Sequence, residues 1–556
     1  MSSVSTDTRV SVPKTFLNVR DISDISDPIF RMSIDLVAAS RRQLSFLRLV
    51  SESHWLHNKP TLLQAIRRYD ELWMPLLSDL GDDESNPPMV LPPFDVQWVW
   101  HCHTLNPASY RLYCESRFSK MLQKPLIFDD ENEDYGLNRC RDIWDYRYPF
   151  EPFELEPRNG NTEEVDIIRY KDIFDEVSKN RYLYSMFSEP YMLEMVYLIV
   201  AKQRYKGFLC MLQRYRDGCS RFVPTLDIQL MWLTHKSYPL IYAEDVKEMV
   251  GDLGKVAGVW DSMKEEEVEA TKKIWERIFY QPYEKAGATL NKIVVGLSKP
   301  PAYWEVSGID VNTKYKSLQP RFLQEVCVFV RGESGNRESQ SLKKKNHDEF
   351  LCLRAVRCHK EFKLSKPITS IPSDTWGKMW HLICEFNTRG ITLELVQSSS
   401  SCLERSKSLS TITFVWNDLL RAPSLILERE LEQHLMAVAS VTPPIQAPYL
   451  LKCVPDRVTD DSGAMISEVI LKRNQYRPQE GRWLSRSVLD HAGHECFVVR
   501  IRVGSGFWRR GGEAPSSVKL TERIVEIREG SWSYVAGSIG VAPAALELPL
   551  FKNVGP

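Results

Sequence analysis

The stretch PPFDVQWVWHCHTLNPASY, residues 92–110, is the part of the chain richest in side chains able to do chemistry. An acid, two tryptophans, two histidines and a cysteine fall between Asp95 and His103. A second stretch, PTLDIQLMWLTHKSYPLIY at residues 224–242, repeats the pattern at the same spacing. Such a repeat indicates duplicated architecture. The matching residues are Asp95 with Asp227, Gln97 with Gln229, Trp100 with Trp232, His103 with His235, Pro107 with Pro239 and Tyr110 with Tyr242.

The first stretch predicts a short helix, because prolines precede it and an Asn-Pro pair closes it. At about 100° per residue, Asp95 and His103 lie on one stripe of that helix, with Trp98 and Cys102 beside it, while His101 points elsewhere.

Two interpretations of this motif compete. In the structural one, the acid caps the helix start, the aromatic rings fill the core, and the histidine bonds to a backbone carbonyl or to the acid. In the other, Asp95, Cys102 and His103 form a divalent-metal or catalytic site, although zinc requires three or four ligands in a tetrahedral array. The structural interpretation is favoured, because Leu233 and Thr234 replace the first histidine and the cysteine in the second copy. The predicted motif core comprises Trp98, Trp100, His101, Asp227, Trp232 and His235.

The helix before the motif also repeats. The segment AIRRY at 65–69 matches AKQRY at 201–205, so each unit reads as a long helix, a loop and a motif helix. Two such units can pack as a pseudo-symmetric helical bundle, in which each covers apolar surface of the other. The acidic and aromatic run at 126–148 is interpreted as a surface loop.

Beyond residue 300 the pattern changes to strand-like runs, which predict a β-sandwich followed by a second β unit. The runs of the sandwich lie at 325–331, 350–356, 380–385, 391–396 and 410–416. The second unit contains Gly504–Gly512, whose glycines surround an aromatic and basic loop. Such a loop can stack a base and neutralise phosphates. The candidate nucleic-acid-binding residues are Arg500, Arg502, Phe507, Trp508, Arg509 and Arg510. The same pattern also suits ordinary β-turns with a buried tryptophan.

The motif resembles the signature Asp-x-x-(Trp/Leu)-x-Trp-His-x-His-x-x-x-Pro of the plant glycine-rich domain-containing proteins, which carry it twice in a large N-terminal domain of unknown function. The first copy is intact here, whereas the second has Trp232-Leu233-Thr234-His235 in place of the usual Trp-His-Thr-His. The C-terminal runs CFVVR at 496–500, GFWRRGG at 506–512 and EIREGSWSYVAGSIG at 526–540 are also similar to that family. The resemblance implies a role in plant development and in stress or hormone response, with a candidate RNA-binding element. The glycine-rich tail of the family is missing, since only 26 of 556 residues are glycine.

The resemblance further implies that the β-sandwich is C2-like. Calcium binding needs clustered carboxylates in the loops, but these loops carry lysine and serine, so we expect an interaction module. The predicted fold class is multidomain α+β. Its parts are a disordered arm at 1–27, a duplicated helical domain at 28–300, a C2-like β-sandwich at 308–455 and a short β-rich domain at 456–556.

Composition sets limits on partners and compartment. The 72 basic and 73 acidic residues give a net charge of −1, so there is no global attraction to nucleic acid or membranes. The 12 cysteines include no Cys-x-x-Cys pair, so no zinc ribbon is indicated. We find neither a signal peptide nor an apolar run of about 18 residues. The prediction is a protein without a membrane span in the cytoplasm, with the nucleus as a second location.

Recognised catalytic signatures are missing from the sequence. There is no Walker A loop, nucleophile elbow, kinase signature set or His-Glu-x-x-His motif. The sequence therefore favours a non-enzymatic regulatory or scaffold protein without a cofactor, which acts through protein partners. The alternatives are an RNA-binding protein using the aromatic and basic loop, and a metal-dependent hydrolase using Asp95, Cys102 and His103.

Overall fold

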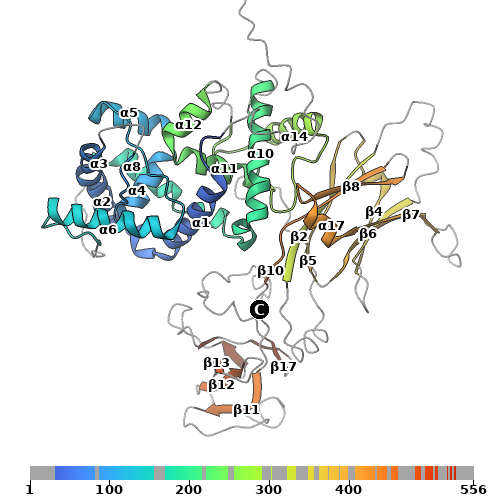
Figure 1. The fold of residues 1–556 in the computed structure, drawn as a ribbon. Coiled ribbons are helices and arrows are strands. Elements are labelled where there is room, and N and C mark those ends of the chain that lie inside the picture. Colours follow the sequence, from blue (N-terminus) through green and yellow to red (C-terminus); the bar gives the residue numbers. More distant parts are fainter. Residues whose placement is uncertain are drawn as a thin grey trace, which may run out of the picture. The chain divides into compact units, whose positions relative to one another are not determined.

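The computed structural model has helices in its N-terminal part and antiparallel sheets in its C-terminal part (Figure 1). The chain divides into two compact units, Met1–Pro301 with Glu325–Leu382 and Arg389–Pro443, and Ala302–Gln324 with Ile383–Thr388 and Pro444–Pro556. The described residues are 32–81, 87–155, 169–215, 221–247, 256–290, 302–303, 322–332, 349–355, 362–373, 375–386, 388–397, 407–432, 435–446 and the strands between 453 and 533. The predicted disordered arm at 1–27 lies outside them.

Helix α1 (Leu36–Glu52) contacts both motif helices. The Ser40 hydroxyl lies 3.1 Å from the Thr234 hydroxyl on α11 (Leu226–Lys236). The Phe46 ring packs edge-on against His101 of α4 (Phe94–Thr104), with 5.6 Å between ring centroids. One helix therefore packs against both copies of the motif.

Each motif helix follows a longer helical segment, as predicted. In the first copy this segment runs through α2 (Lys59–Arg67), the π-helical η4 (Arg68–Trp73) and α3 (Met74–Leu80). In the second it is the uninterrupted α10 (Met195–Arg214). A proline then opens the next helix in both copies, where its missing N–H costs nothing. These next helices are α5 (Pro107–Phe118) and α12 (Pro239–Asp245).

The loop interpretation of 126–148 is wrong, because most of this run is helix α6 (Asp130–Arg147). The Asp129 carboxylate accepts a hydrogen bond from the Asn132 N–H at 2.8 Å and so caps the helix. The acidic residues form the first turn, where they interact favourably with the helix dipole. The buried residues recur every fourth position and make one buried face: Gly136, Cys140 and Trp144. The remaining helical elements are η3 (His54–His57), α8 (Lys171–Asn180), α9 (Leu183–Met186), η5 (Pro190–Leu193) and α14 (Glu265–Phe279).

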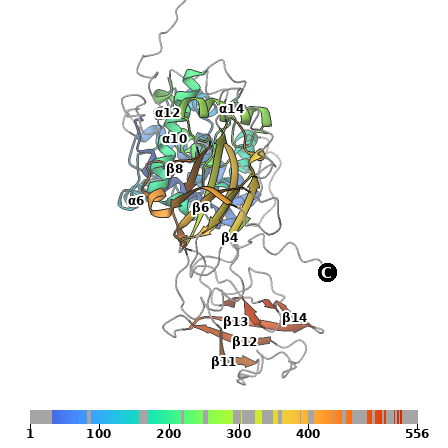
Figure 2. The same cartoon turned by 90° about the vertical axis from the view of Figure 1, so that its right-hand side faces the viewer.

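Two sheets follow, with strand orders β1-β5-β2-β9-β8 and β4-β3-β6-β7. Figure 2 shows β4, β6 and β8 from a second direction. Strands predicted near 325–331, 350–356, 380–385, 391–396 and 410–416 are confirmed, whereas β4, β8 and β9 were missed. The bounds are β1 (Ala302–Tyr303), β2 (Phe322–Gly332), β3 (Glu349–Ala355), β4 (Phe362–Pro367), β5 (Gly377–Glu385), β6 (Gly390–Gln397), β7 (Lys407–Val415), β8 (Ile426–Glu432), β9 (Leu435–Val441) and β10 (Ile445–Gln446), with the short helices η9 (Ile368–Ser370) and α17 (Trp416–Arg421).

Within the first unit, the chain after α14 packs against the sheets. The Lys285 ammonium group donates to the Ser424 carbonyl at 3.0 Å. Another lysine, Lys378 on β5, lies 2.9 Å from the Glu284 carboxylate. Polar contacts therefore tie the helical part of this unit to its strands.

The C-terminal strands are β11 (Cys453–Asp460), β12 (Trp483–Leu489), β13 (Glu495–Gly504), β14 (Phe507–Arg510), β15 (Glu522–Arg523), β16 (Glu526–Arg528) and β17 (Ser531–Ser533). The predicted aromatic and basic loop is corrected here, because residues 507–510 form a strand that pairs antiparallel with β13. No helix in the described part of the chain is both long and apolar enough for a bilayer crossing.

Candidate functional site

In each copy of the repeat, a buried ion pair joins the longer helical segment to the motif helix. In the first copy, Arg68 Nε lies 3.0 Å from Asp95 Oδ2, and the side chains are 0% and 1% exposed. In the second copy, Arg204 Nε lies 2.6 Å from Asp227 Oδ2, with the same exposures. Burial raises the pKa of Asp95 to about 6, against the opposing effect of Arg68. The acid is therefore held as a carboxylate at neutral pH beside its arginine.

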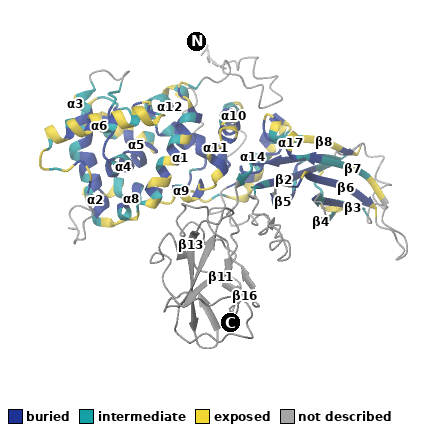
Figure 3. Cartoon of the chain, turned by 60° about the horizontal axis from the view of Figure 1, so that its bottom comes forward, coloured by how far each residue is buried: buried dark blue, intermediate teal, exposed yellow. Residues whose placement is uncertain are grey.

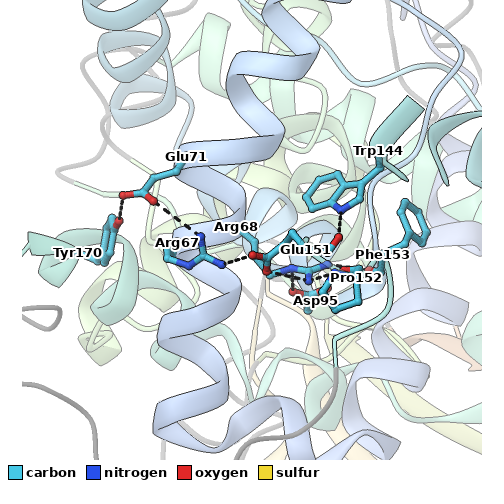
Figure 4. Close-up of polar contacts among 9 residues, drawn as sticks. All are labelled: Arg67, Arg68, Glu71, Asp95, Trp144, Glu151, Pro152, Phe153 and Tyr170. Carbon is cyan, nitrogen blue, oxygen red and sulfur yellow. Dashed lines mark hydrogen bonds and ion pairs between the residues drawn. The ribbon is translucent and has the colours of Figure 1, made fainter. Parts of the chain in front are cut away.

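Each arginine is held from further sides, and Figure 4 shows this for Arg68 of the first copy. Arg68 donates to the carbonyl oxygens of Pro152 and Phe153 at 2.8 and 2.7 Å, and its guanidinium carbon lies 5.1 Å from the ring centroid of Trp144. The matching Arg204 donates to the Tyr283 carbonyl at 2.6 Å and lies 4.9 Å from the ring centroid of Trp275. The two copies thus enclose the arginine in similar ways, with a carboxylate, a carbonyl and an indole.

The motif histidines bond to tyrosines on the preceding helix. The Tyr69 hydroxyl lies 2.8 Å from His103 Nδ1, and the Tyr205 hydroxyl lies 3.1 Å from His235 Nδ1. The motif tryptophans likewise donate to the tyrosines that follow them, each at 3.0 Å: Trp100 Nε1 to the Tyr110 hydroxyl and Trp232 Nε1 to the Tyr242 hydroxyl. The shared histidines, tryptophans and tyrosines therefore make the same side-chain contacts in both copies.

The expected packing role of the aromatic residues agrees with their burial, and α4 and α11 are buried along most of their length (Figure 3). Two details of the prediction are wrong. Asp95 does not cap its helix, since Pro93 occupies that position and Asp95 binds Arg68 instead. The partner of His103 Nδ1 is the phenol of Tyr69, rather than a carbonyl or the motif acid.

The copies differ at the positions of His101 and Cys102. Both side chains are buried, and burial lowers the pKa of His101 well below its usual value and raises that of Cys102 well above. The His101 ring stacks on Trp98, with 6.1 Å between centroids. A thiol in this environment stays protonated in the absence of a cation and is a poor nucleophile.

The structure does not bring Asp95, Cys102 and His103 together as a ligand set. Among the described residues, the group of three possible ligands whose donor atoms lie within 4.8 Å of one another is Glu325, Cys327 and His381. Metal binding at the motif stays a prediction.

The sequence interpretation missed the partners of the two acids, although a signal was present. Arg68 and Arg204 occupy the same place in the repeated AIRRY and AKQRY segments. A repeated charge on one helix and a repeated opposite charge on the next could have suggested the pair. The tryptophans whose rings pack against the two arginines, Trp144 and Trp275, lie outside the repeated segments. Their role was therefore not apparent from the sequence.

The candidate nucleic-acid-binding residues lie on two adjacent strands, β13 and β14, of a five-stranded sheet. Arg502 of β13 pairs with Arg509 of β14, and Gly504 pairs with Phe507. Directly paired positions share a face, and so do alternate positions along a strand. By this register, positions 500, 502, 507 and 509 share one face, whereas Trp508 and Arg510 belong to the other.

Comparisons with known proteins agree with this arrangement of two motif-bearing segments. The model of the family "Glycine-rich domain-containing protein-like" matches residues 11–112 and 109–245, each with one copy of the motif. The model "Glycine Rich Domain Protein C-terminal domain" matches residues 488–553. The chain belongs to the plant glycine-rich domain-containing protein family.

Two relatives from Arabidopsis thaliana show how far the similarity extends. Glycine-rich domain-containing protein 1 is 32% identical over 278 residues, which cover 46% of this chain and 33% of the relative. Glycine-rich domain-containing protein 2 is 31% identical over 271 residues, which cover 46% of this chain and 34% of the relative. The chain therefore matches about a third of the length of each.

Removing either acid should destabilise the fold strongly. We expect Asp95→Ala and Asp227→Ala each to lower the free energy of unfolding by about 3–5 kcal/mol, because each removes the buried carboxylate paired with a buried arginine. The loss should be the smaller one for Asp95→Ala, since Arg68 keeps Glu151 Oε1 at 3.3 Å. Chemical denaturation of the full chain measures this. The matched control is Glu115→Ala, which breaks the exposed pair with Arg111 and should cost less than about 1 kcal/mol. Equal small losses in all three variants would contradict a structural role for the buried pairs.

The stability of the fold should also depend on the protonation of His103. Burial lowers its pKa to about 4, so between pH 6.5 and 4 the unfolded chain binds a proton that the folded chain does not. This group therefore makes stability fall with decreasing pH, by up to roughly 3 kcal/mol across that window. Asp95 acts oppositely, because its raised pKa favours the folded state at low pH.

The contribution of His103 is isolated by the difference between the wild type and His103→Gln. We expect the stability of the variant to decline less steeply between pH 6.5 and 4, as measured by denaturation at closely spaced pH values. Parallel curves for the two proteins would show that His103 is protonated equally in both states.

Proposed function

We propose that this chain is a non-enzymatic scaffold or regulatory protein. Its helical region acts as a rigid support made of two pseudo-symmetric motif units, and its C2-like sandwich acts as an interaction module for other proteins. The observation that carries the proposal is that the acid, the second histidine and the second tryptophan of the motif are buried, and that each contacts a partner side chain in both copies.

A catalytic site must offer its acid, base or nucleophile to a substrate. Asp95 is instead paired with Arg68, His103 with Tyr69, and the Cys102 thiol is buried. In the second copy Asp227 pairs with Arg204 and His235 with Tyr205. The same contacts in two copies are expected of a packing unit. The resemblance to the plant family adds a role in development and in stress or hormone response, in the cytoplasm with the nucleus as a second location.

Proximity labelling in plant cells tests the scaffold role. We expect the full chain to label a reproducible set of proteins, and His103→Gln, which removes the acid–base group but can still bond to Tyr69, to label the same set. Asp95→Ala should lose the set in proportion to its loss of folded protein, because it destroys the support and not a reaction.

An enzymatic outcome would look different. If purified wild-type chain hydrolysed phosphate or carboxylic esters in the presence of divalent metal, and folded His103→Gln did not, the hydrolase alternative would replace the scaffold proposal. Melting temperature and circular dichroism establish that the variant is folded.

A second candidate function, RNA binding, is favoured by one specific observation. Two arginines, Arg502 and Arg509, stand directly opposite each other on β13 and β14. Like charges at directly opposite positions destabilise a sheet, and a polyanion on that face would relieve the repulsion. Phe507 shares the face by register and is a residue type on which bases stack.

Binding of a fluorescent single-stranded RNA oligonucleotide tests this candidate. We expect the slope of log affinity against log salt to fall by about 2 in Arg502→Ala plus Arg509→Ala, since each phosphate contact contributes about 1. Arg510→Ala, on the other face by register, is the control and should leave the slope unchanged. No measurable binding by the wild type, or equal slopes in all variants, would refute the RNA-binding role.

A further inference from the structure

Three side chains with metal-ligand chemistry meet on the first sheet, away from the duplicated motif. Glu325 and Cys327 lie on β2, and His381 lies on the neighbouring β5. A carboxylate oxygen, the thiol sulfur and an imidazole nitrogen from these residues all lie within 4.8 Å of one another.

The strands explain why the three side chains converge. Glu325 and Cys327 are two residues apart on a strand, so both side chains project from the same face. His381 comes from the adjacent strand, and its Nε2 lies 2.7 Å from Glu325 Oε1. Ligands on neighbouring strands of a sheet are held with little freedom, which favours a defined site.

We propose that Glu325, Cys327 and His381 bind one Zn²⁺ ion. Thiolate, imidazole and carboxylate are the donors that zinc takes in proteins, at about 2.0–2.3 Å. Bonds of that length place tetrahedral ligand atoms roughly 3.4 Å apart. Shifts of about 1 Å in the donor atoms, by rotation of the side chains, would bring them to that spacing. Water completes the tetrahedron, because no fourth cysteine, histidine or carboxylate among the described residues joins the group.

Charge balance favours a divalent ion at this place. The Cys327 residue is fully buried, and the Glu325 and His381 side chains are only 16% and 10% exposed. One thiolate and one carboxylate neutralise Zn²⁺, and a neutral cluster avoids much of the cost of burying net charge.

The carboxylate is held by groups outside the cluster. The Gly287 N–H donates to Glu325 Oε1 at 3.1 Å, and the Tyr191 hydroxyl lies 3.4 Å from Oε2. Gly287 adopts φ +70°, a conformation that glycine reaches without strain. Such outer contacts orient metal ligands and support affinity.

Two lysines near the cluster have other partners. Lys285 donates to the Ser424 carbonyl, and burial lowers its pKa to about 7. Lys378 lies 2.9 Å from Glu284. The charge of Lys378 is matched by Glu284, and the lowered pKa of Lys285 reduces the positive charge that it places near the cluster.

A bound zinc ion would fasten β2 to β5. Through the contacts of Glu325 with Tyr191 and Gly287 it would also strengthen the attachment of the helical part to the sheet within the first unit. The ion would therefore help to hold the helices and the sheet of this unit in one orientation.

Zinc content tests the site directly. The full chain is stripped with chelator, reloaded with Zn²⁺, freed of excess ion, and measured by elemental analysis and by melting temperature. We expect one zinc ion per chain and a higher melting temperature in the wild type. In Cys327→Ser and in His381→Gln we expect zinc affinity to fall at least tenfold, so that these variants lose the ion when the excess is removed.

Two controls separate this site from other thiols and from the motif. Cys384→Ser makes the same chemical change at a buried cysteine on β5, and His103→Gln alters the motif; both should keep the zinc. Substitution by Co²⁺ should give thiolate-to-cobalt charge-transfer absorption that Cys327→Ser lacks.

The proposal is overturned if the wild type binds no zinc, or if Cys327→Ser and His381→Gln retain it. Loss of zinc in His103→Gln but not in His381→Gln would assign the metal to the motif instead. If Cys327→Ser does not fold, His381→Gln and the cobalt spectrum of the wild type decide the question.

Discussion

The helical region depends on a buried ion pair that occurs twice. An arginine on the longer helix and an aspartate on the motif helix are both removed from solvent, which is costly unless each charge is fully matched. The cost is offset by the carboxylate, by backbone carbonyls and by an aromatic face, as with Arg68 between Asp95, Pro152 and Trp144. These partners come from separate segments of the chain, so the pair is complete only when the segments have assembled. An interaction of this kind favours one arrangement of the helices over alternatives that would leave a charge unmatched.

Around each pair lie the same secondary contacts. A tyrosine from the longer helix bonds to the motif histidine, and the motif tryptophan bonds to a tyrosine on the following helix. The surrounding backbone is less uniform: the first copy contains the π-helical η4, and the second has the continuous α10. The contacts are therefore maintained despite different local helix geometry, because a few long side chains can reach the same partners from slightly different backbones.

The duplicated motif and the proposed zinc site lie in different parts of the first unit. The motif supplies the packing of the helices, whereas Glu325, Cys327 and His381 lie where the sheet receives contacts from Tyr191 and Gly287. The helical support and the strands of this unit are linked there by polar groups.

Much of the secondary structure was predictable from local pattern. The repeated pattern located the motif helices and the longer helices before them, and strand-like runs located β2, β3 and β6. The loop prediction for 126–148 failed because a run of acidic residues suits a helix's first turn and exposed face as well as it suits a loop. The strand β8 was missed because its leucine, glutamate and arginine residues are typical of helices. The strand β9 was missed because its alanines have a low strand propensity.

The sequence by itself determined the duplication, the order of helical and β regions, the family and the identity of the motif residues. These properties follow from spacing along the chain, which reports neighbours within one helix or strand. Only the tertiary structure decided that Asp95 binds Arg68 rather than capping its helix, and that Glu325 and Cys327 meet His381. Their partners lie far away in sequence, and the physical reason is that burial and the matching of charges act between elements brought together by packing, which local spacing does not record.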